Sequence, residues 1–143
     1  MNLSIQSLEV TEIILKLLIA ILCGGLLAFE RIQPFKKYFS KILVSISFAT
    51  CFLVLIWERL GFATEVALPV VFISSIIIAV GLFTSGIILI HHGSAESIVL
   101  SVSIWVAAGI GMAIGFSLYH TAIIATILGY VILYLMDKTV LGE

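Results

Sequence analysis

Apolar residues fill this chain in long runs, and only short polar gaps separate one run from the next. A helix that crosses a bilayer needs about 20 predominantly apolar residues. The pattern therefore predicts five membrane-spanning helices, over residues 11–29, 41–57, 66–90, 97–117 and 120–136. We expect helices rather than a barrel, because the runs do not alternate polar and apolar residues as barrel strands do.

Polar and turn-forming residues mark the ends of these runs. Glu30 and Arg31 close the first run, and Pro34 breaks the chain after it. Gly93 is expected to cap the third helix at its C-terminus, and Ser94 is expected to cap the fourth helix at its N-terminus.

Lys16 is the charged residue that interrupts the first run. Glu12 precedes it by four residues, in the order that favours an ion pair on one helix face. Because Lys16 lies near the end of its helix, we expect its long side chain to reach the membrane interface.

Composition sets the class of protein. Hydrophobic residues make up 62% of the chain and charged residues 10%, and the mean hydropathy is +1.32. A soluble domain carries roughly 25% charged residues, so the expected solvent of this chain is the lipid bilayer. We predict one integral-membrane domain over residues 1–143, all-α, built as a polytopic transmembrane helix bundle. The net charge of −1 gives no reason to expect nucleic acid as a partner.

Lysine and arginine predict the orientation, because they concentrate in cytoplasmic loops. Most of them lie in the first loop or after the last span, and few lie on the opposite side. The first group is Arg31, Lys36, Lys37, Lys41 and Lys138, and the second is Lys16 and Arg59. We therefore expect the N-terminus outside and the C-terminus in the cytoplasm.

Small residues recur at four-residue spacing in several predicted helices, and in lipid such residues let helix backbones approach closely. The candidates for helix packing are Gly24 and Ala28 in the first helix, Ala107, Gly111 and Gly115 in the fourth, and Ala125 and Gly129 in the fifth. The turn between the last two helices is short, which makes them antiparallel neighbours. We expect the Gly111 and Gly115 face to meet the Ala125 and Gly129 face.

Three stretches resemble the MgtC/SapB family of bacterial inner-membrane proteins. Residues 24–31 (GGLLAFER) are similar to the family's glycine-containing run closed by Leu-Glu-Arg. Residues 79–86 (AVGLFTSG) resemble its glycine-rich signature. Residues 105–119 (WVAAGIGMAIGFSLY) match best, with Trp105 and the glycines in the family register.

The resemblance covers nearly the whole chain, and it implies a divergent member that consists of the membrane domain. It implies five spans in the bacterial inner membrane with a cytoplasmic C-terminus. It also implies a link to adaptation to low magnesium or to virulence. The chain departs from the family at residues 39–41 (FSK), where members carry Arg-Thr-His, and at residues 99–100 (VL), where members carry Thr-Thr.

Six residues are candidates for a functional role: Glu30, Arg31, Gly81, Ser85, Gly86 and Trp105. Adjacent helical residues point about 100° apart, so Glu30 and Arg31 either anchor the helix at the interface or pair with neighbouring helices. The glycine-rich half of the third helix either permits tight packing or bends and lines a cleft. His91, His92 and Glu96 are expected to form a solvated loop rather than a metal site.

The sequence shows no nucleophile and base at catalytic spacing, and we expect no enzyme activity, no cofactor and no metal. The leading hypothesis is a regulatory or interaction protein of the membrane, with a membrane-protein partner or a second copy of itself. The alternative is a small transporter or channel subunit, with Glu30 and the third helix along the path.

Overall fold

A computed structural model describes residues 2–29, 36–60 and 67–140 of the chain. Its elements are five helices: α1 (Asn2–Ala28), α2 (Lys36–Arg59), α3 (Ala67–Ile90), α4 (Ala95–Gly115) and α5 (Tyr119–Val140). Each helix is long and apolar enough to cross a membrane. The predicted all-α, five-helix class is therefore confirmed, and the protein is a multipass membrane protein.

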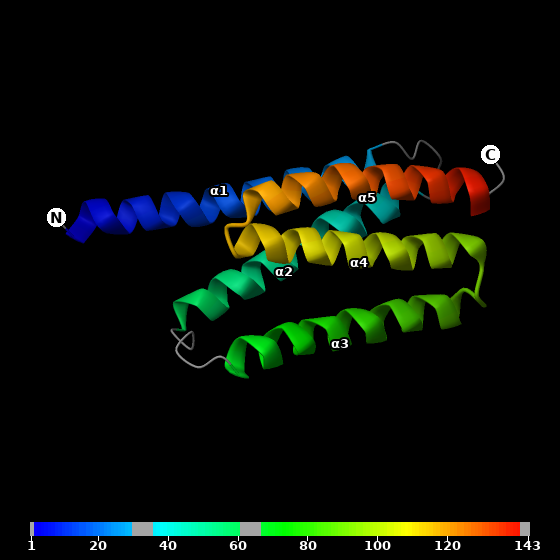
Figure 1. The fold of residues 1–143 in the computed structure, drawn as a ribbon, viewed down its shortest axis with the longest axis horizontal. Helices are drawn as coiled ribbons and strands as arrows, with labels where there is room; N and C mark the ends of the chain where they lie inside the picture. The colour runs from blue at the N-terminus through cyan, green and yellow to red at the C-terminus, as the bar shows by residue number, and fades with distance from the viewer. Residues whose placement is uncertain (1, 30–35, 61–66, 141–143) are drawn as a thin grey trace.

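The first helix is longer than the sequence pattern indicated. It begins at Asn2 rather than near residue 11 and holds 27 residues, which corresponds to about 40 Å of helix. The hydrocarbon core of a bilayer is only about 30 Å thick. Figure 1 shows the N-terminal part of α1 (blue) extending past the ends of the other helices.

Helix α4 lies at the centre of the bundle and packs against each of the other four helices. In the most apolar 18-residue stretch of α4, 56% of the residues are buried, whereas 11% are buried in the corresponding stretch of α3. Helix α3 packs mainly against α4 and lies on the outside (Figure 1). Its outward side chains are large and apolar, such as Ile78 and Leu82, as a lipid-facing surface requires.

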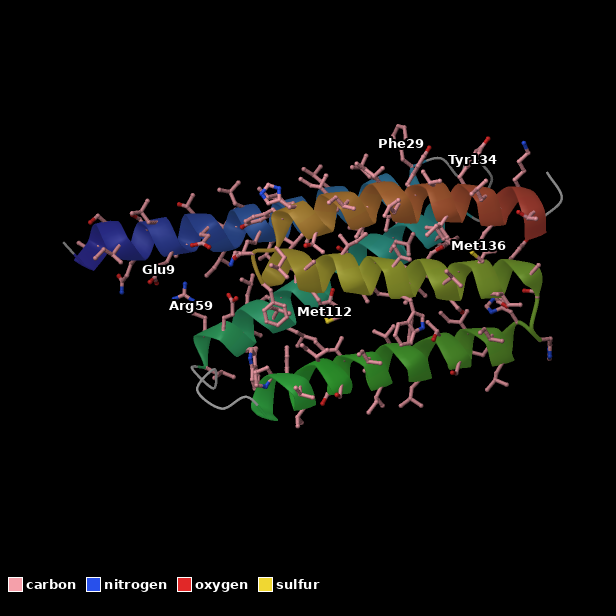
Figure 2. The ribbon with its side chains drawn as sticks, viewed as in Figure 1. Glu9, Phe29, Arg59, Met112, Tyr134 and Met136 are labelled. Atoms are coloured by element: carbon pink, nitrogen blue, oxygen red, sulfur yellow. The ribbon has the colours of Figure 1, made fainter. Side chains whose placement is uncertain are left out.

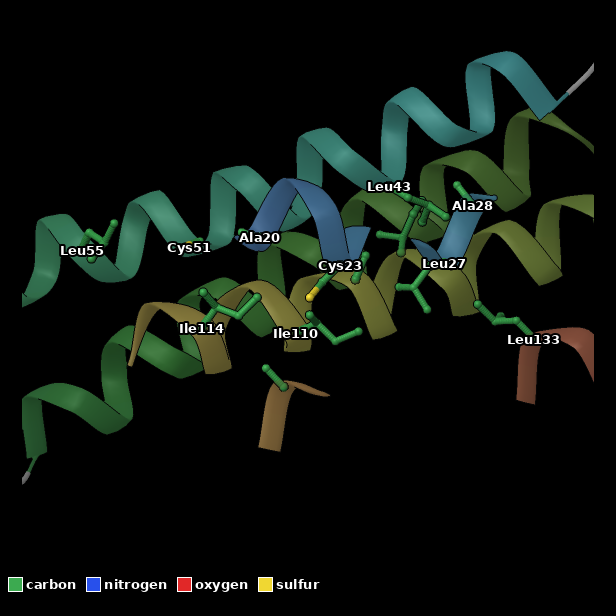
Figure 3. Packing of buried hydrophobic residues seen from close by; sticks show 13 residues of the cluster. Ala20, Cys23, Leu27, Ala28, Leu43, Cys51, Leu55, Ile110, Ile114 and Leu133 are labelled. Atoms are coloured by element: carbon green, nitrogen blue, oxygen red, sulfur yellow. The ribbon is translucent and has the colours of Figure 1, made fainter. Parts of the chain in front are cut away.

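The core combines fully buried aliphatic side chains with small residues that bring the helices together (Figure 3). Leu43 of α2 and Ile110 and Ile114 of α4 are almost completely buried. Ala20 of α1 and Ala107 of α4 are likewise buried. The alanines leave space for the longer aliphatic side chains of the facing helices, which is how apolar interiors reach high packing density.

Helix ends follow the predicted capping, with one correction. Ser94 caps α4 as expected, because its hydroxyl oxygen accepts a hydrogen bond from the Ser97 amide at 3.3 Å. At the end of α3 the left-handed residue that terminates the helix is His92 (φ 51°), and Gly93 (φ 69°) follows it. The Gly93 amide bonds to the Ile88 carbonyl, which completes a Schellman motif.

The expected partner of Gly111 and Gly115 was wrong. A Cβ atom on Gly111 would lie 2.3 Å from the Ser47 carbonyl oxygen, and one on Gly115 would lie 2.6 Å from the Val54 Cβ. Both neighbours belong to α2, so this face of α4 meets α2 rather than α5. Helices α4 and α5, which the short turn joins, do pack together, but through a different face of α4. There, a Cβ on Gly129 would approach Val106 at 2.7 Å.

Candidate functional site

The most unusual side chain in the described part of the bundle is Lys16. It lies in α1 and is only 4% exposed, and because α1 begins at Asn2, Lys16 lies in the middle of its helix rather than near the end as expected. A cation removed from water and placed among apolar helices is costly unless it is paired. The surroundings of Lys16 supply that pairing from three helices.

Two carboxylates and one carbonyl surround the Lys16 ammonium. Its Nζ lies 3.3 Å from Oε1 of Glu12, which confirms the predicted pair on α1. It also lies 3.7 Å from Oε2 of Glu58 on α2 and donates a hydrogen bond to the Gly115 carbonyl of α4 at 3.4 Å. Lys16 therefore ties α1 to α2 and to α4.

The Gly115 carbonyl is available because of how α4 ends. The last four carbonyls of a helix lack partners within the helix. Amides of the following turn bond to the carbonyls of Met112, Ala113 and Ile114. Gly115 carries the next carbonyl along the helix, and this carbonyl accepts a hydrogen bond from Lys16. The cation also lies at the negative end of the α4 dipole, where a positive charge is stabilised.

A second ion pair lies next to the first. The Nη1 atom of Arg59 is 2.8 Å from Oε2 of Glu9, and Figure 2 shows the two side chains beside each other near the N-terminal part of α1. We call Glu9, Glu12, Lys16, Glu58 and Arg59 the ionic cluster. Apart from Lys16, its side chains are substantially exposed, from 42% for Glu58 to 63% for Glu12.

Sequence reasoning found only one contact of the ionic cluster. Glu12 and Lys16 are four residues apart on one helix, and this spacing is a local signal. Glu58 and Arg59 lie at the far end of α2, and only the antiparallel packing of α1 on α2 brings them to Lys16 and Glu9. No local spacing carries that information.

The residues selected from the sequence lie elsewhere. Glu30 and Arg31 are outside the described residues. Gly81 of α3 and Trp105 of α4 meet, since a Cβ on Gly81 would lie 3.6 Å from Cζ2 of the Trp105 ring. Ser85 is exposed and donates to the Gly81 carbonyl at 2.7 Å. A Cβ on Gly86 would meet no atom within 4 Å. The structure thus joins Gly81 to Trp105 but directs Ser85 away from the bundle.

The hydroxyl groups of α3 are all used inside their own helix. Ser74, Ser75, Thr84 and Ser85 each donate to a carbonyl three or four residues earlier. Such bonds leave little free donor capacity on the helix surface. Between helices, Ser101 of α4 donates weakly to the Thr84 carbonyl at 3.4 Å. The hydroxyls of α3 therefore find their hydrogen-bond acceptors within their own helix.

The α1–α2 contact contains a polar bond that sequence reasoning missed. The Ser47 hydroxyl is fully buried and donates to the Ala20 carbonyl of α1 at 2.9 Å. The approach is close because Gly24 has no side chain, and a Cβ there would lie 3.0 Å from the Ser47 Cβ. Of the other packing candidates, Ala28 is buried and Ala125 packs against the core.

Metal-ligating groups do not gather in the described part of the chain. No three His, Cys, Asp or Glu side chains among the residues searched are arranged to hold a metal ion. His91 is exposed, and its Nδ1 lies 3.0 Å from the Ile87 carbonyl of its own helix. Cys23 and Cys51 are buried and unpaired with each other.

Comparison with known proteins adds one finding. The sequence profile of the MgtC family matches residues 17–140, which is most of the chain. Searches of the curated proteins and of the solved structures found no match. The match begins directly after Lys16, so the N-terminal part of α1 and all three α1 residues of the ionic cluster precede it.

Proposed function

This chain belongs to the MgtC family, and on that premise we propose that it is a regulatory or interaction protein of the bacterial inner membrane rather than an enzyme. The family is linked to magnesium homeostasis, and the proposed role is in that homeostasis or in the response to stress. The proposed partner is another membrane protein or a second copy of this chain.

The position of α3 carries the proposal. This helix packs mainly against α4 and leaves most of its apolar surface exposed. Its hydroxyls are bonded to its own backbone, so its surface suits contact with another helix better than passage of a polar solute. Helices in lipid associate through packing of such surfaces.

Site-specific photocrosslinking in native membranes tests this proposal. A photoreactive residue at Leu82, on the outward face of α3, is expected to give a defined protein adduct. The matched control is the same residue at Ile76, which is buried in the bundle and should give no intermolecular adduct. Lipid adducts alone at Leu82 would count against a protein partner on this face.

The link to magnesium needs a separate test. Deleting the gene from its host should slow growth when magnesium is limiting, and a plasmid copy should restore growth. Growth that depends equally on the gene at high and low magnesium would refute the link while leaving the interaction proposal standing.

A small transporter or channel subunit is the second candidate, and the buried Lys16 favours it. Ionisable side chains inside membrane spans often lie on the paths of ions and protons. Cysteines introduced singly at Ser74, Ser85 and Ser103 test for such a path, after Cys23 and Cys51 are replaced by alanine. If aqueous thiol reagents label none of the three in intact membranes, a water-filled path along α3 and α4 is refuted.

The proposed orientation has the N-terminus outside and the C-terminus in the cytoplasm. It places the ionic cluster at the outer face of the membrane, because α2 and α4 both end there. The distribution of lysine and arginine supports this orientation.

A further inference from the structure

A groove lies between α1 and α2 next to the ionic cluster. It is lined by Ile13 of α1, by Phe52, Leu55, Ile56 and Arg59 of α2, and by Leu60, which directly follows α2; its volume is about 230 Å³. Apart from Arg59, every one of these side chains is apolar. The groove belongs neither to the α3 surface nor to the buried environment of Lys16.

The groove exists because the two helices touch at one end and separate at the other. Around Gly24 the backbones are close, since a Cβ there would lie 3.2 Å from the Val44 Cα. Toward Arg59 the helices diverge, and Figure 1 shows α2 leaning away from the N-terminal part of α1. Leu55 forms the floor and is buried, whereas Phe52 and Ile56 are partly exposed.

The open side of the groove faces the hydrocarbon of the bilayer. Phe52 and Ile56 lie in the last turns of a membrane-spanning helix and Leu60 directly follows it, and all three have large exposed areas. An apolar groove in this position excludes water and accommodates a flexible hydrocarbon chain. Arg59 lies at the level of the helix end, where a lipid headgroup would be.

The charges at the mouth select the kind of headgroup. Arg59 offers a planar guanidinium with five N–H donors, and Glu9 is bonded to its Nη1, which leaves donors for a phosphate. The ionic cluster has three carboxylates against two cations, an excess of one negative charge. That excess repels a headgroup with net negative charge and attracts an ammonium group.

We propose that this groove binds one acyl chain of a zwitterionic aminophospholipid of the phosphatidylethanolamine type. The phosphate lies beside Arg59, and the ammonium lies beside the exposed carboxylates of Glu9 and Glu12. The chain fills the space between Ile13 and Ile56. This proposal is independent of the proposed function, because it concerns a different face of the bundle.

Native mass spectrometry of the purified full-length protein tests the proposal. The protein is titrated with phosphatidylethanolamine or with phosphatidylglycerol, and the wild type is expected to retain the first more strongly. Replacing Ile56 with Trp fills the groove and should abolish that preference. The matched control, Ile78→Trp, adds the same bulk on the exposed face of α3 and should leave it unchanged.

Two charge variants test the headgroup assignment. Arg59→Gln removes the phosphate donor and is expected to weaken retention of phosphatidylethanolamine about tenfold, the effect of losing one charge-assisted hydrogen bond. Glu9→Gln removes one negative charge and should shift the preference toward phosphatidylglycerol. Thermal unfolding of each variant in detergent identifies any variant that fails to fold. The lipid preferences of the folded variants then decide whether the headgroup assignment is correct.

Equal retention of phosphatidylethanolamine by the wild type, Ile56→Trp and Ile78→Trp would overturn the groove as a lipid site. A wild-type preference for phosphatidylglycerol would overturn the zwitterionic assignment. Neither result would bear on photocrosslinking from α3, so failure of the lipid site and failure of the proposed function are distinguishable.

Discussion

Replacing Gly111 with Ala adds one methyl group at the glycine whose added Cβ would lie closest to a neighbouring helix, among the described glycines. The new Cβ would lie 2.1 Å from the Thr50 Oγ1 and 2.3 Å from the Ser47 carbonyl oxygen. The Thr50 hydroxyl can rotate away, because it belongs to a side chain. The Ser47 carbonyl is part of the α2 backbone, so α2 and α4 must move apart.

The magnitude follows from the cost of overpacking. Adding a methylene-sized group to a well-packed interior costs about 1–3 kcal/mol. The greater helix propensity of alanine offsets up to about 1 kcal/mol of this. In lipid no hydrophobic force between helices compensates for the lost contact. We expect Gly111→Ala to lower the free energy of unfolding by about 1–2 kcal/mol.

Gly109 provides a matched control on the same helix. A Cβ at Gly109 would meet no atom within 4 Å, and the substitution makes the same change in helix propensity. Gly109→Ala should therefore be neutral or slightly stabilising. Gly115→Ala should fall between the two, because its Cβ would lie 2.6 Å from the Val54 Cβ and 3.2 Å from the Cys51 carbonyl oxygen, which are longer distances than those at Gly111.

The stabilities of the three variants are compared by unfolding them in detergent micelles, with heat or with a denaturing detergent. The expected order of stability is Gly109→Ala, then Gly115→Ala, then Gly111→Ala. If Gly109→Ala and Gly111→Ala unfold at the same point, the close contact between α2 and α4 does not exist as described.

Three further predictions concern single side chains, and a fourth concerns topology. Lys16→Met removes one partner of the ion pairs with Glu12 and Glu58 and should lower stability in detergent by up to about 3–5 kcal/mol, and unchanged thermal unfolding would contradict the view that Lys16 ties α1 to α2 and α4. Ser47→Ala should cost only about 0.6 kcal/mol in the same measurement, and a cost equal to that of Gly111→Ala would contradict it. Ser117 has φ 62°, so Ser117→Gly should raise the unfolding temperature by relieving about 1 kcal/mol of strain; no change would argue against a left-handed residue there. A reporter fused after Glu143 should be active only in the cytoplasm and one at residues 61–64 only outside, and the reverse would overturn the orientation.

The sequence alone determined the solvent, the helices and the local contacts. An apolar content of 62% leaves lipid as the surroundings, and in lipid the backbone must bond within helices. Ser94 capped α4 and Glu12 paired with Lys16 as predicted, because both contacts join residues within one turn of the chain. The motifs around Gly81 and Trp105 pointed to the family that the profile match then confirmed.

Only the tertiary structure decided which helix faces meet. In a soluble helix the polar face indicates the outside, but here the lipid-facing and core-facing sides are both apolar, so the pattern does not distinguish them. The spacing of Gly111 and Gly115 predicted a close contact and left its partner open, and the structure assigns that partner to α2. The burial of Lys16 depends likewise on Glu58 and on the Gly115 carbonyl. Residues so far apart in sequence come together only when three helices pack, and no spacing along one helix encodes that packing.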